Sequence, residues 1–337
     1  MIRSLAAMPW NAVAASRVAL YRNGWLKTQR LPLPVISVGA LEMGGTGKTP
    51  ATIAVASMLR EHGIRAAVLS RGYARTGNQP TLVGVGAGPI ENATVSGDEP
   101  WLMSHLLPDV PVAVAARREG AARLVPDGSA DVFVLDDGFQ HVRVHRQLDL
   151  LVVDPAAPFW EQSPPPLGRL REGTAAACRA DAFLLRGEAR TALPDAFSAQ
   201  PRFNLHQLPT RFVPLSTWIA NPDSAGVDAP TESCAAFAGI ARPRRFVDDL
   251  RELGLRVDFA QQYRDHQTFT ATEIRGLAEG CRLRECATLV TTEKDAARLA
   301  HLDLDDVNIL VATHRMEFDD PTPFLEAVAD ARVRHTS

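Results

Sequence analysis

The sequence is short of several features that would narrow its class at once. It has four cysteines, Cys178, Cys234, Cys281 and Cys286, and no two of them form a CxxC pair. Neither a zinc site nor a disulfide framework is therefore indicated. No repeat of solenoid length and no low-complexity tract occurs. The net charge of −3 gives no reason to expect nucleic acid as a partner.

Acidic residues are missing from one end of the chain. No aspartate or glutamate precedes Glu42. The first 30 residues therefore carry a charge of about +5, from Arg3, Arg17, Arg22, Lys27 and Arg30. Apolar residues such as Trp10 and Trp25 are mixed with these cations and never reach the ~18 uninterrupted residues that a spanning helix needs.

This basic segment predicts an amphipathic helix that lies in the headgroup region of an anionic leaflet without crossing it. A core-packing helix and a signal peptide are the alternatives. Pro9 and Asn11 interrupt the apolar region, which argues against a signal peptide.

The length of 337 residues exceeds the ~250 to 300 at which single cores stop growing, so two domains are expected. Buried-strand candidates alternate with helical patterns at 50–62 and 117–125. The strand candidates are PVISVG, AAVLS, VPVAVA, ADVFVLDD and LDLLVVD. The alternation predicts an α/β fold with a doubly wound parallel sheet.

A change of texture follows. Two extended segments, RFNLHQL and RFVPL, precede the polar stretch NPDSAGVDAPTES, which is typical of a connector. A second alternating region begins at residue 235 and predicts a smaller α/β unit. Its strands are AAFAGI, LRVDFAQQY, TLVTTE and NILVAT, and its helices cover 243–253 and 271–283, the latter behind a capping box of Thr270 and Glu273.

The stretch MGGTGKTP, residues 43–50, directly follows the first strand. Glycines let backbone amides curl around phosphate, Lys48 reaches the β and γ oxygens, and Thr49 can ligate magnesium. The usual pattern has glycine where this chain has Glu42, so the match is partial. Of the 36 basic side chains only Lys27, Lys48 and Lys294 are lysine, which favours a required ammonium in the loop. A glycine-rich turn without a ligand is the alternative.

Two further motifs carry carboxylates. VFVLDD places Asp136 and Asp137 at the end of a strand, where phosphate-loop enzymes present a carboxylate to magnesium; an Asx turn into Gly138 is the alternative. GDEP places Asp98 and Glu99 at the start of a helix, where both could also be capping residues.

Two more stretches carry candidate binding groups. SRGYAR follows another strand and offers Arg71, Tyr73 and Arg75 to anionic groups. In the DH pair, His266 could be a base, the partner of a base or a surface imidazole.

Taken together, the GGTGKTP loop, SRGYAR, GDEP, DDGFQH, FAGIARPRRF, DH and TTEKDA resemble the tetraacyldisaccharide 4'-kinases, over about residues 2–325. The resemblance implies ATP-dependent phosphorylation of a tetraacyldisaccharide 1-phosphate at the cytoplasmic face of the bacterial inner membrane. It implies a peripheral protein, expected to be a monomer, that contacts the anionic membrane and uses ATP and Mg²⁺.

The resemblance also implies a domain plan and a set of site residues. The plan is a membrane-associating helix over 1–30, a P-loop NTPase-like kinase domain over 31–200, a two-stranded linker over 201–232 and a smaller α/β domain over 233–337. Asp98 would be the base, assisted by His266, and Lys48 would act on the phosphates. The cofactor site would comprise Gly44, Gly45, Thr46, Gly47, Lys48 and Thr49. The magnesium side would comprise Thr49, Glu99, Asp136 and Asp137. Substrate positioning would fall to Arg71, Tyr73, Gln140 and Arg171.

Two other classes remain open. A membrane scaffold ATPase also joins such a loop to a basic helix, although its loop carries a lysine where this chain has Met43. A nucleotide-binding regulator without catalysis is the third, and the number of carboxylates argues against it.

Overall fold

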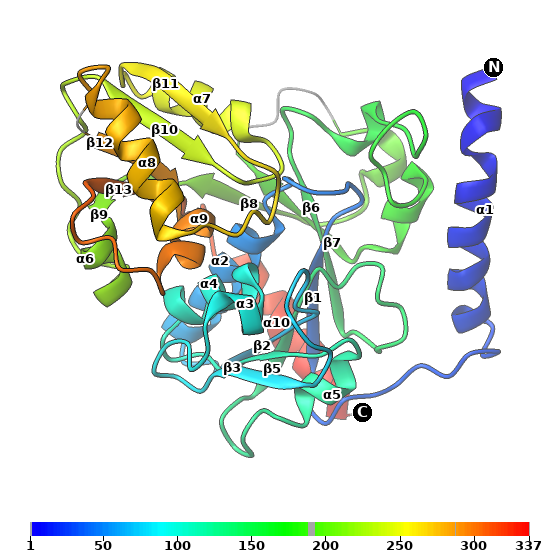
Figure 1. Ribbon diagram of the computed structural model, residues 1–337. Helices are drawn as coiled ribbons and strands as arrows, with labels where there is room; N and C mark the ends of the chain where they lie inside the picture. Colours follow the sequence, from blue (N-terminus) through cyan, green and yellow to red (C-terminus); the bar gives the residue numbers. More distant parts are fainter. Residues whose placement is uncertain (1, 188–192, 287, 337) are drawn as a thin grey trace.

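The computed structural model of the chain describes residues 2–187, 193–286 and 288–336. Two sheets and a separate N-terminal helix make up the architecture (Figure 1). This confirms the expected α/β class with a large parallel sheet and a second, smaller unit.

Within those described ranges the first sheet has nine strands in the order β14-β8-β7-β6-β1-β5-β2-β4-β3. Neighbours from β8 to β4 are parallel, and β3 and β14 pair antiparallel at the two edges. The strands are β1 Val35–Gly39, β2 Ala66–Ser70, β3 Thr81–Gly84, β4 Val112–Val114, β5 Val132–Asp136, β6 Leu148–Val153, β7 Ala182–Arg186, β8 Arg202–Gln207 and β14 Met316–Phe318.

The strands of this sheet are apolar on both faces because each face packs in a core of its own. Ile36 and Val38 of β1 belong to the core cluster that contains α2, whereas Val35 belongs to the one that contains Ala121 of α5. Helices on both faces explain why the strands form continuous apolar runs. The helical segments of this region are α2 Lys48–Glu61, α3 Ala93–Ser96, α4 Asp98–Leu106, α5 Arg118–Ala122, η1 Phe159–Glu161, η2 Thr174–Arg179, η3 Asp195–Phe197 and α10 Thr322–Thr336.

The second sheet has the order β11-β10-β12-β13-β9, with β9 antiparallel to β13. The predicted capping box of Thr270 and Glu273 is confirmed at the start of α8. The elements are β9 Phe212–Pro214, α6 Leu215–Ala220, β10 Cys234–Ala238, α7 Pro243–Glu252, β11 Val257–Gln262, α8 Ala271–Arg282, β12 Thr288–Thr292, α9 Glu293–Leu299 and β13 Ile309–Ala312.

The two sheets exchange chain segments, which the division at residue 233 did not anticipate. The two strands of the expected linker lie in different sheets, since β8 belongs to the first sheet and β9 to the second. After β13 the chain returns: β14 pairs with β8, and α10 packs on β1 and β6 with Phe324 fully buried. The end of the chain therefore belongs with the first sheet, because its apolar side chains complete that core.

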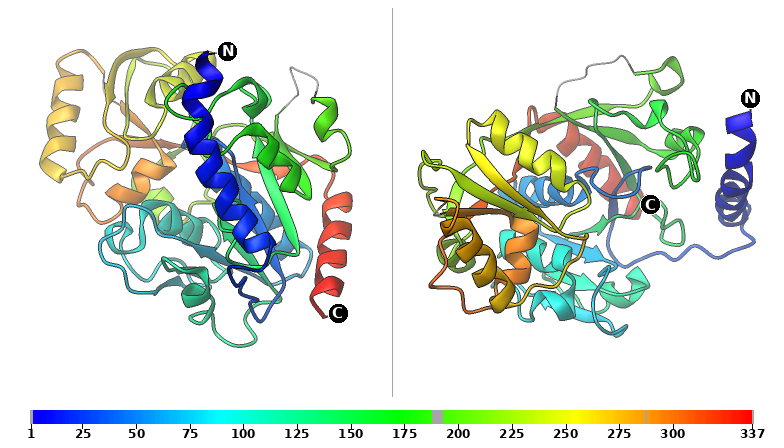
Figure 2. Two further views of the ribbon diagram at one scale, coloured as in Figure 1. Left: turned by 90° about the vertical axis from the view of Figure 1, so that its right-hand side faces the viewer. Right: turned by 45° about the horizontal axis from the view of Figure 1, so that its top comes forward.

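Helix α1, Ile2–Arg22, lies apart from both sheets and is joined to β1 by residues 23–34 (Figures 1 and 2). Arg17 reaches the body of the protein, where its Nη2 donates to the carbonyl oxygen of Gln140 at 2.8 Å. Val13 and Trp25 are 73% and 79% exposed. Within the described residues, no helix combines the length and apolar character that crossing a bilayer requires.

Candidate active site

The loop between β1 and α2 has the shape of a phosphate cradle. Gly44, Gly45 and Gly47 have φ values of 62°, 66° and 79°, which glycine adopts without strain. Gly47 is the N-cap of α2, and no side chain caps that helix. The helix therefore begins with free amides that face the loop, an arrangement that favours an anion.

Three guanidinium groups that the sequence interpretation missed surround the loop. A Cβ built on Gly44 would lie 3.1 Å from Arg169 Nη2, and one on Gly45 would lie 3.1 Å from Arg242 Nε. The Arg186 guanidinium likewise occupies the space beside Gly47, and its Nη2 lies 3.4 Å from Asp154 Oδ2. The three arginines come from a loop, the second sheet's region and β7. They make the cradle strongly positive.

Glu42 occupies the position where a typical loop has glycine. Its side chain is buried, and Gln162 Nε2 donates to Glu42 Oε1 at 3.2 Å. Burial raises the pKa of this carboxyl against the effect of Lys48. Glu42 also forms an isolated bridge to Leu170, so the residue ties the start of the loop to the segment that carries Arg169.

Lys48 lies beside the carboxylates that end β5. Its Nζ is 3.7 Å from Asp137 Oδ1 and donates to Thr46 Oγ1 at 3.4 Å. Arg171 Nη1 donates to Asp137 Oδ2 at 2.7 Å and to Gln140 Oε1 at 3.1 Å. Partial burial opposes ionisation of Asp137, but the charges of Lys48 and Arg171 outweigh it and keep the pKa below its usual range.

Asp136 lies deeper, and among the described residues its carboxylate forms no ion pair within 4.0 Å. Its carboxylate accepts from Ser70 Oγ at 2.8 Å and from Thr52 Oγ1 at 3.3 Å. Burial, and then the negative charges of Glu99 and Asp137, raise its pKa to about 6. Arg118 is buried beneath it and donates through Nη2 to the Asp136 carbonyl oxygen at 2.8 Å. Hydroxyl groups orient the carboxylate, and the nearby charge of Arg118 offsets only part of the effect of burial on its pKa.

These residues fit a magnesium ion that arrives with a nucleotide. No group of three or more histidine, cysteine, aspartate or glutamate side chains in the described ranges forms a ready metal cage. Magnesium is usually held by one or two carboxylates together with phosphate oxygens and water. The unneutralised Asp136, flanked by Asp137 and Glu99, meets that requirement.

Asp98 forms the second half of the site. It is the first residue of α4, is 5% exposed, and follows Gly97, which is the N-cap. Its Oδ2 lies 3.0 Å from His266 Nδ1 and 3.8 Å from Lys294 Nζ, and it accepts from Arg298 Nε at 3.0 Å. Burial opposes ionisation, but these three partners together hold the pKa well below its usual range.

Lys294 joins the two halves. Its Nζ donates to Glu99 Oε1 at 3.0 Å. The negative charge of Glu99 in turn raises the pKa of Asp136. His266, in the left-handed conformation with φ 61°, places its ring 5.1 Å from that of Tyr73. Contacts therefore join Lys48 to Asp137 and, through Lys294, Glu99 to Asp98, and the charges of Asp137 and Glu99 both raise the pKa of Asp136.

The outcome for the remaining sequence candidates is mixed. Arg171 contacts Asp137 and Gln140, whereas Arg71 is exposed at the end of β2, where its charge lowers the pKa of Arg118. No local sequence pattern predicts the roles of the buried Arg118 or of the arginines at 169, 186 and 298. The TTEKDA stretch was noticed, and it proves to supply Lys294.

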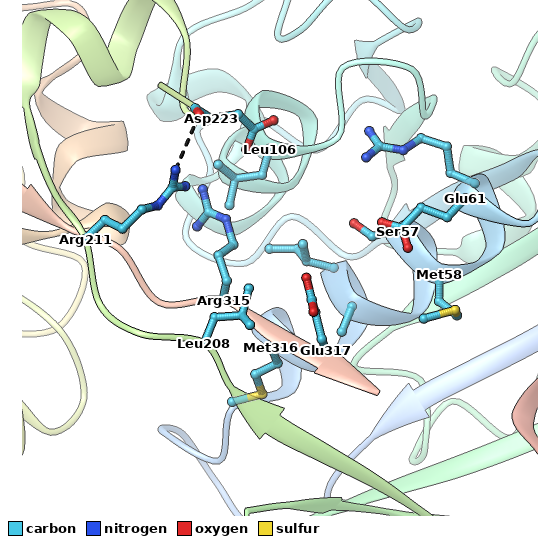
Figure 3. Close-up of a pocket in the computed structure, with 13 residues that line it drawn as sticks. Ser57, Met58, Glu61, Leu106, Leu208, Arg211, Asp223, Arg315, Met316 and Glu317 are labelled. Atoms are coloured by element: carbon cyan, nitrogen blue, oxygen red, sulfur yellow. Dashed lines mark hydrogen bonds between the residues drawn. The ribbon is translucent and has the colours of Figure 1, made fainter. Parts of the chain in front are cut away.

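A cavity of about 170 Å³ lies elsewhere, between α2, β14 and the segment 208–223 (Figure 3). Arg211 and Arg315 point into it, and Arg211 donates to the Asp223 carbonyl oxygen at 3.4 Å. Its lining includes neither the phosphate loop nor Asp98. The cavity is therefore not the nucleotide site.

Comparisons with known proteins agree with this geometry. The family model described as "Tetraacyldisaccharide-1-P 4'-kinase" matches residues 2–332. A protein named tetraacyldisaccharide 4'-kinase from Anaeromyxobacter dehalogenans strain 2CP-C is 39% identical over 302 residues, 88% of this chain and 80% of the relative. One of the same name from Pelobacter propionicus is 38% identical over 320 residues, covering 93% and 87%. A crystal structure of LpxK from Aquifex aeolicus, described as an "apo" form in complex with ATP, superposes with a TM-score of 0.78 at 27% identity, covering 98% of this chain and 100% of that one.

Proposed function

The chain belongs to the tetraacyldisaccharide-1-P 4'-kinase family, and on that premise we propose how its residues carry out the reaction. It is a phosphotransferase that uses ATP and Mg²⁺ to phosphorylate the 4'-hydroxyl of a tetraacyldisaccharide 1-phosphate, a lipid A precursor. The glycolipid is its substrate.

The nucleotide half binds ATP. The amides of residues 44–49 and the ammonium of Lys48 receive the phosphates, with the guanidinium groups of Arg169 and Arg242 beside them. Thr49, Asp136, Asp137 and Glu99 would hold magnesium, which neutralises the charge that spreads over the phosphoryl oxygens.

The acceptor half takes the proton. As the 4'-oxygen forms its bond to the γ-phosphorus, the bond from phosphorus to the bridging oxygen breaks and ADP leaves with the electron pair. The proton of the 4'-hydroxyl passes to Asp98, with His266 sharing the charge. Arg71 and Tyr73, exposed at the end of β2, line the approach for the sugar.

One observation carries this assignment: Lys48 lies 3.7 Å from Asp137, Lys294 lies 3.0 Å from Glu99 and 3.8 Å from Asp98, and the negative charges of Asp137 and Glu99 both raise the pKa of Asp136. Phosphoryl transfer passes through a loose transition state, so catalysis consists mainly of holding donor and acceptor in line. Two groups of charged contacts, one at the phosphate loop and one at the base, which both act on the pKa of Asp136, support that role.

The basic N-terminal helix accounts for how the enzyme meets its substrate. A glycolipid leaves the bilayer only at ~0.8 kcal/mol per exposed methylene, so the enzyme goes to the membrane. We place α1 and the exposed Trp25 at the surface of an anionic leaflet, on the cytoplasmic side of the inner membrane, with the protein acting as a peripheral monomer.

The test is transfer of labelled phosphate from ATP to the tetraacyldisaccharide 1-phosphate in detergent. Asp98→Asn should lower turnover by roughly 10²- to 10⁴-fold. Asn92→Ala is the matched control, because Asn92 caps the adjacent α3 by accepting from the Val95 amide at 3.1 Å; its loss costs stability of about 1 kcal/mol and spares turnover. Label released only as free phosphate by the wild type would instead favour a scaffold ATPase.

A further inference from the structure

Arg298 is the side chain that ties the second domain to the base, and it was not among the expected site residues. It lies on α9, is 7% exposed, and is separated from Asp98 by 200 positions in the chain. Its Nε donates to Asp98 Oδ2 at 3.0 Å, and its Nη2 also contacts that oxygen. Helices α4 and α9 pack together at this point. The contact therefore spans the two sheets.

The guanidinium is fixed from its own side before it reaches Asp98. Its Nη1 donates to the Gly239 carbonyl oxygen and to Asp295 Oδ1, each at 2.8 Å. Asp295 is fully buried and accepts from the Gly239 amide at 3.1 Å and from Thr292 Oγ1 at 2.7 Å. Hydrogen bonds thus hold Arg298 against the end of β10 and the start of α9. We call this hydrogen-bonded group, Gly239, Thr292, Asp295 and Arg298, the mount around Arg298.

The two carboxylate oxygens of Asp98 have different hydrogen-bond and charge partners. Oδ2 faces Arg298, His266 and Lys294, whereas Oδ1 accepts from the Glu99 amide at 3.0 Å and, among the described residues, from no other group. A carboxylate has about four lone-pair positions. Engagement of Oδ2 by the second domain leaves Oδ1 with a free position that can accept a proton.

We propose that Arg298 is a positioning residue for phosphoryl transfer: from the second domain it fixes the orientation of the Asp98 carboxylate, so that the base is in place only when the two domains are in contact. This inference rests on the proposed role of Asp98 as the base. In this role Arg298 acts through Asp98, its partner at 3.0 Å, and not on the substrate or the nucleotide. A planar fork suits the task, since it can bond Asp98 on one edge and Gly239 and Asp295 on the other.

The experiment compares Arg298→Gln and Arg298→Lys in the full-length enzyme, with Arg275→Gln as the matched control. Arg275 also lies on a helix of the second domain and pairs with Asp306 at 2.9 Å, but within that domain. Arg298→Gln should lower kcat by about 10²-fold, since a small misplacement of a reacting group costs that much, while the KM for ATP stays within about threefold. Arg298→Lys should recover part of kcat. Arg275→Gln should keep it.

A double-mutant cycle separates positioning from mere stability. If Arg298 acts through Asp98, adding Arg298→Gln to Asp98→Asn should lower kcat by no more than about twofold further. Equal losses of kcat in both backgrounds, or a full kcat in folded Arg298→Lys, would overturn the inference. If Arg298→Gln does not fold, the kcat of Arg298→Lys is the measurement that tests the inference. Failure of the proposed function is distinct: there the wild type itself transfers no phosphate to lipid, or Asp98→Asn retains full turnover.

Discussion

The two halves of the site are built differently. The nucleotide half, from Lys48 to Asp136 and Asp137, belongs almost entirely to the first sheet, and its members contact one another there. In the acceptor half, the Asp98 carboxylate comes from α4 of the first domain, and the cationic and imidazole partners His266, Lys294 and Arg298 come from the second. The former is assembled within one domain, whereas the latter exists only through the domain contact. Nucleotide binding and proton removal should therefore be separable by mutation.

Breaking the nucleotide half gives the largest effect on ATP binding. Lys48→Ala removes the ammonium that lies 3.7 Å from Asp137, and we expect kcat/KM to fall by about 10²- to 10³-fold together with loss of ATP binding. Asp98→Asn should lose turnover but keep ATP binding. Calorimetric titration of both variants with ATP and Mg²⁺ checks the contrast. If the two variants lost ATP affinity equally, the halves would not be separable.

Asp136→Asn should affect activity and stability in opposite directions. Turnover should fall by about 10²-fold because the magnesium side loses its charge. The free protein should gain about 1 to 2 kcal/mol at pH 8, because the native pKa of about 6 exceeds the ordinary value near 4. The stability from protonated Asp136 is complete below pH ~4 and is lost as the pH rises through 6.

Thermal unfolding without nucleotide at pH 4.5 and pH 8 measures that change. The gain from Asp136→Asn should be present at the higher pH and small at the lower one. Asp131→Asn is the control, since Asp131 pairs with Arg65 at the surface and its pKa is lowered. An Asp136→Asn protein that is destabilised at pH 8 would mean that the site carries a compensating cation of its own.

What the sequence could predict differs between the halves for the same reason. The strands β1 and β5 and the loop after β1 follow from local apolar runs and glycine spacing, which predict Lys48 and the Asp136–Asp137 pair at one edge of the sheet. The structure has Lys48 Nζ 3.7 Å from Asp137, and the roles of these residues stay predictions. Arg298 could not be identified, because its contact with Asp98 spans 200 positions and a helical arginine usually faces solvent. Arg118, in the run AARREG, looks equally ordinary and is nonetheless buried. The three-residue β14 is too short to carry a pattern.

Arg242→Ala tests a contribution of the second domain to the nucleotide half. Its Nε lies 3.1 Å from where a Gly45 Cβ would be, so its loss should raise the KM for ATP by about tenfold, as for one charged contact, with kcat little changed. Arg244→Ala is the control from the same run, since that side chain is exposed. A fall in kcat larger than the rise in KM would place Arg242 on the transferring group instead.

The smallest expected effect comes from a substitution that lowers the stability of the second domain without moving the residues that contact Asp98. Thr270→Ala removes the capping box of α8, in which Thr270 Oγ1 accepts from the Glu273 amide at 3.2 Å, and should cost about 1 kcal/mol. Thr268→Ala, two residues earlier and exposed, should cost less. Both should keep wild-type kcat, because α8 carries none of the partners of Asp98 and the mount around Arg298 stays intact. A kcat that fell together with the melting temperature across this pair would contradict the comparison. Activity would then depend on the stability of the second domain and not on the position in which it holds Arg298.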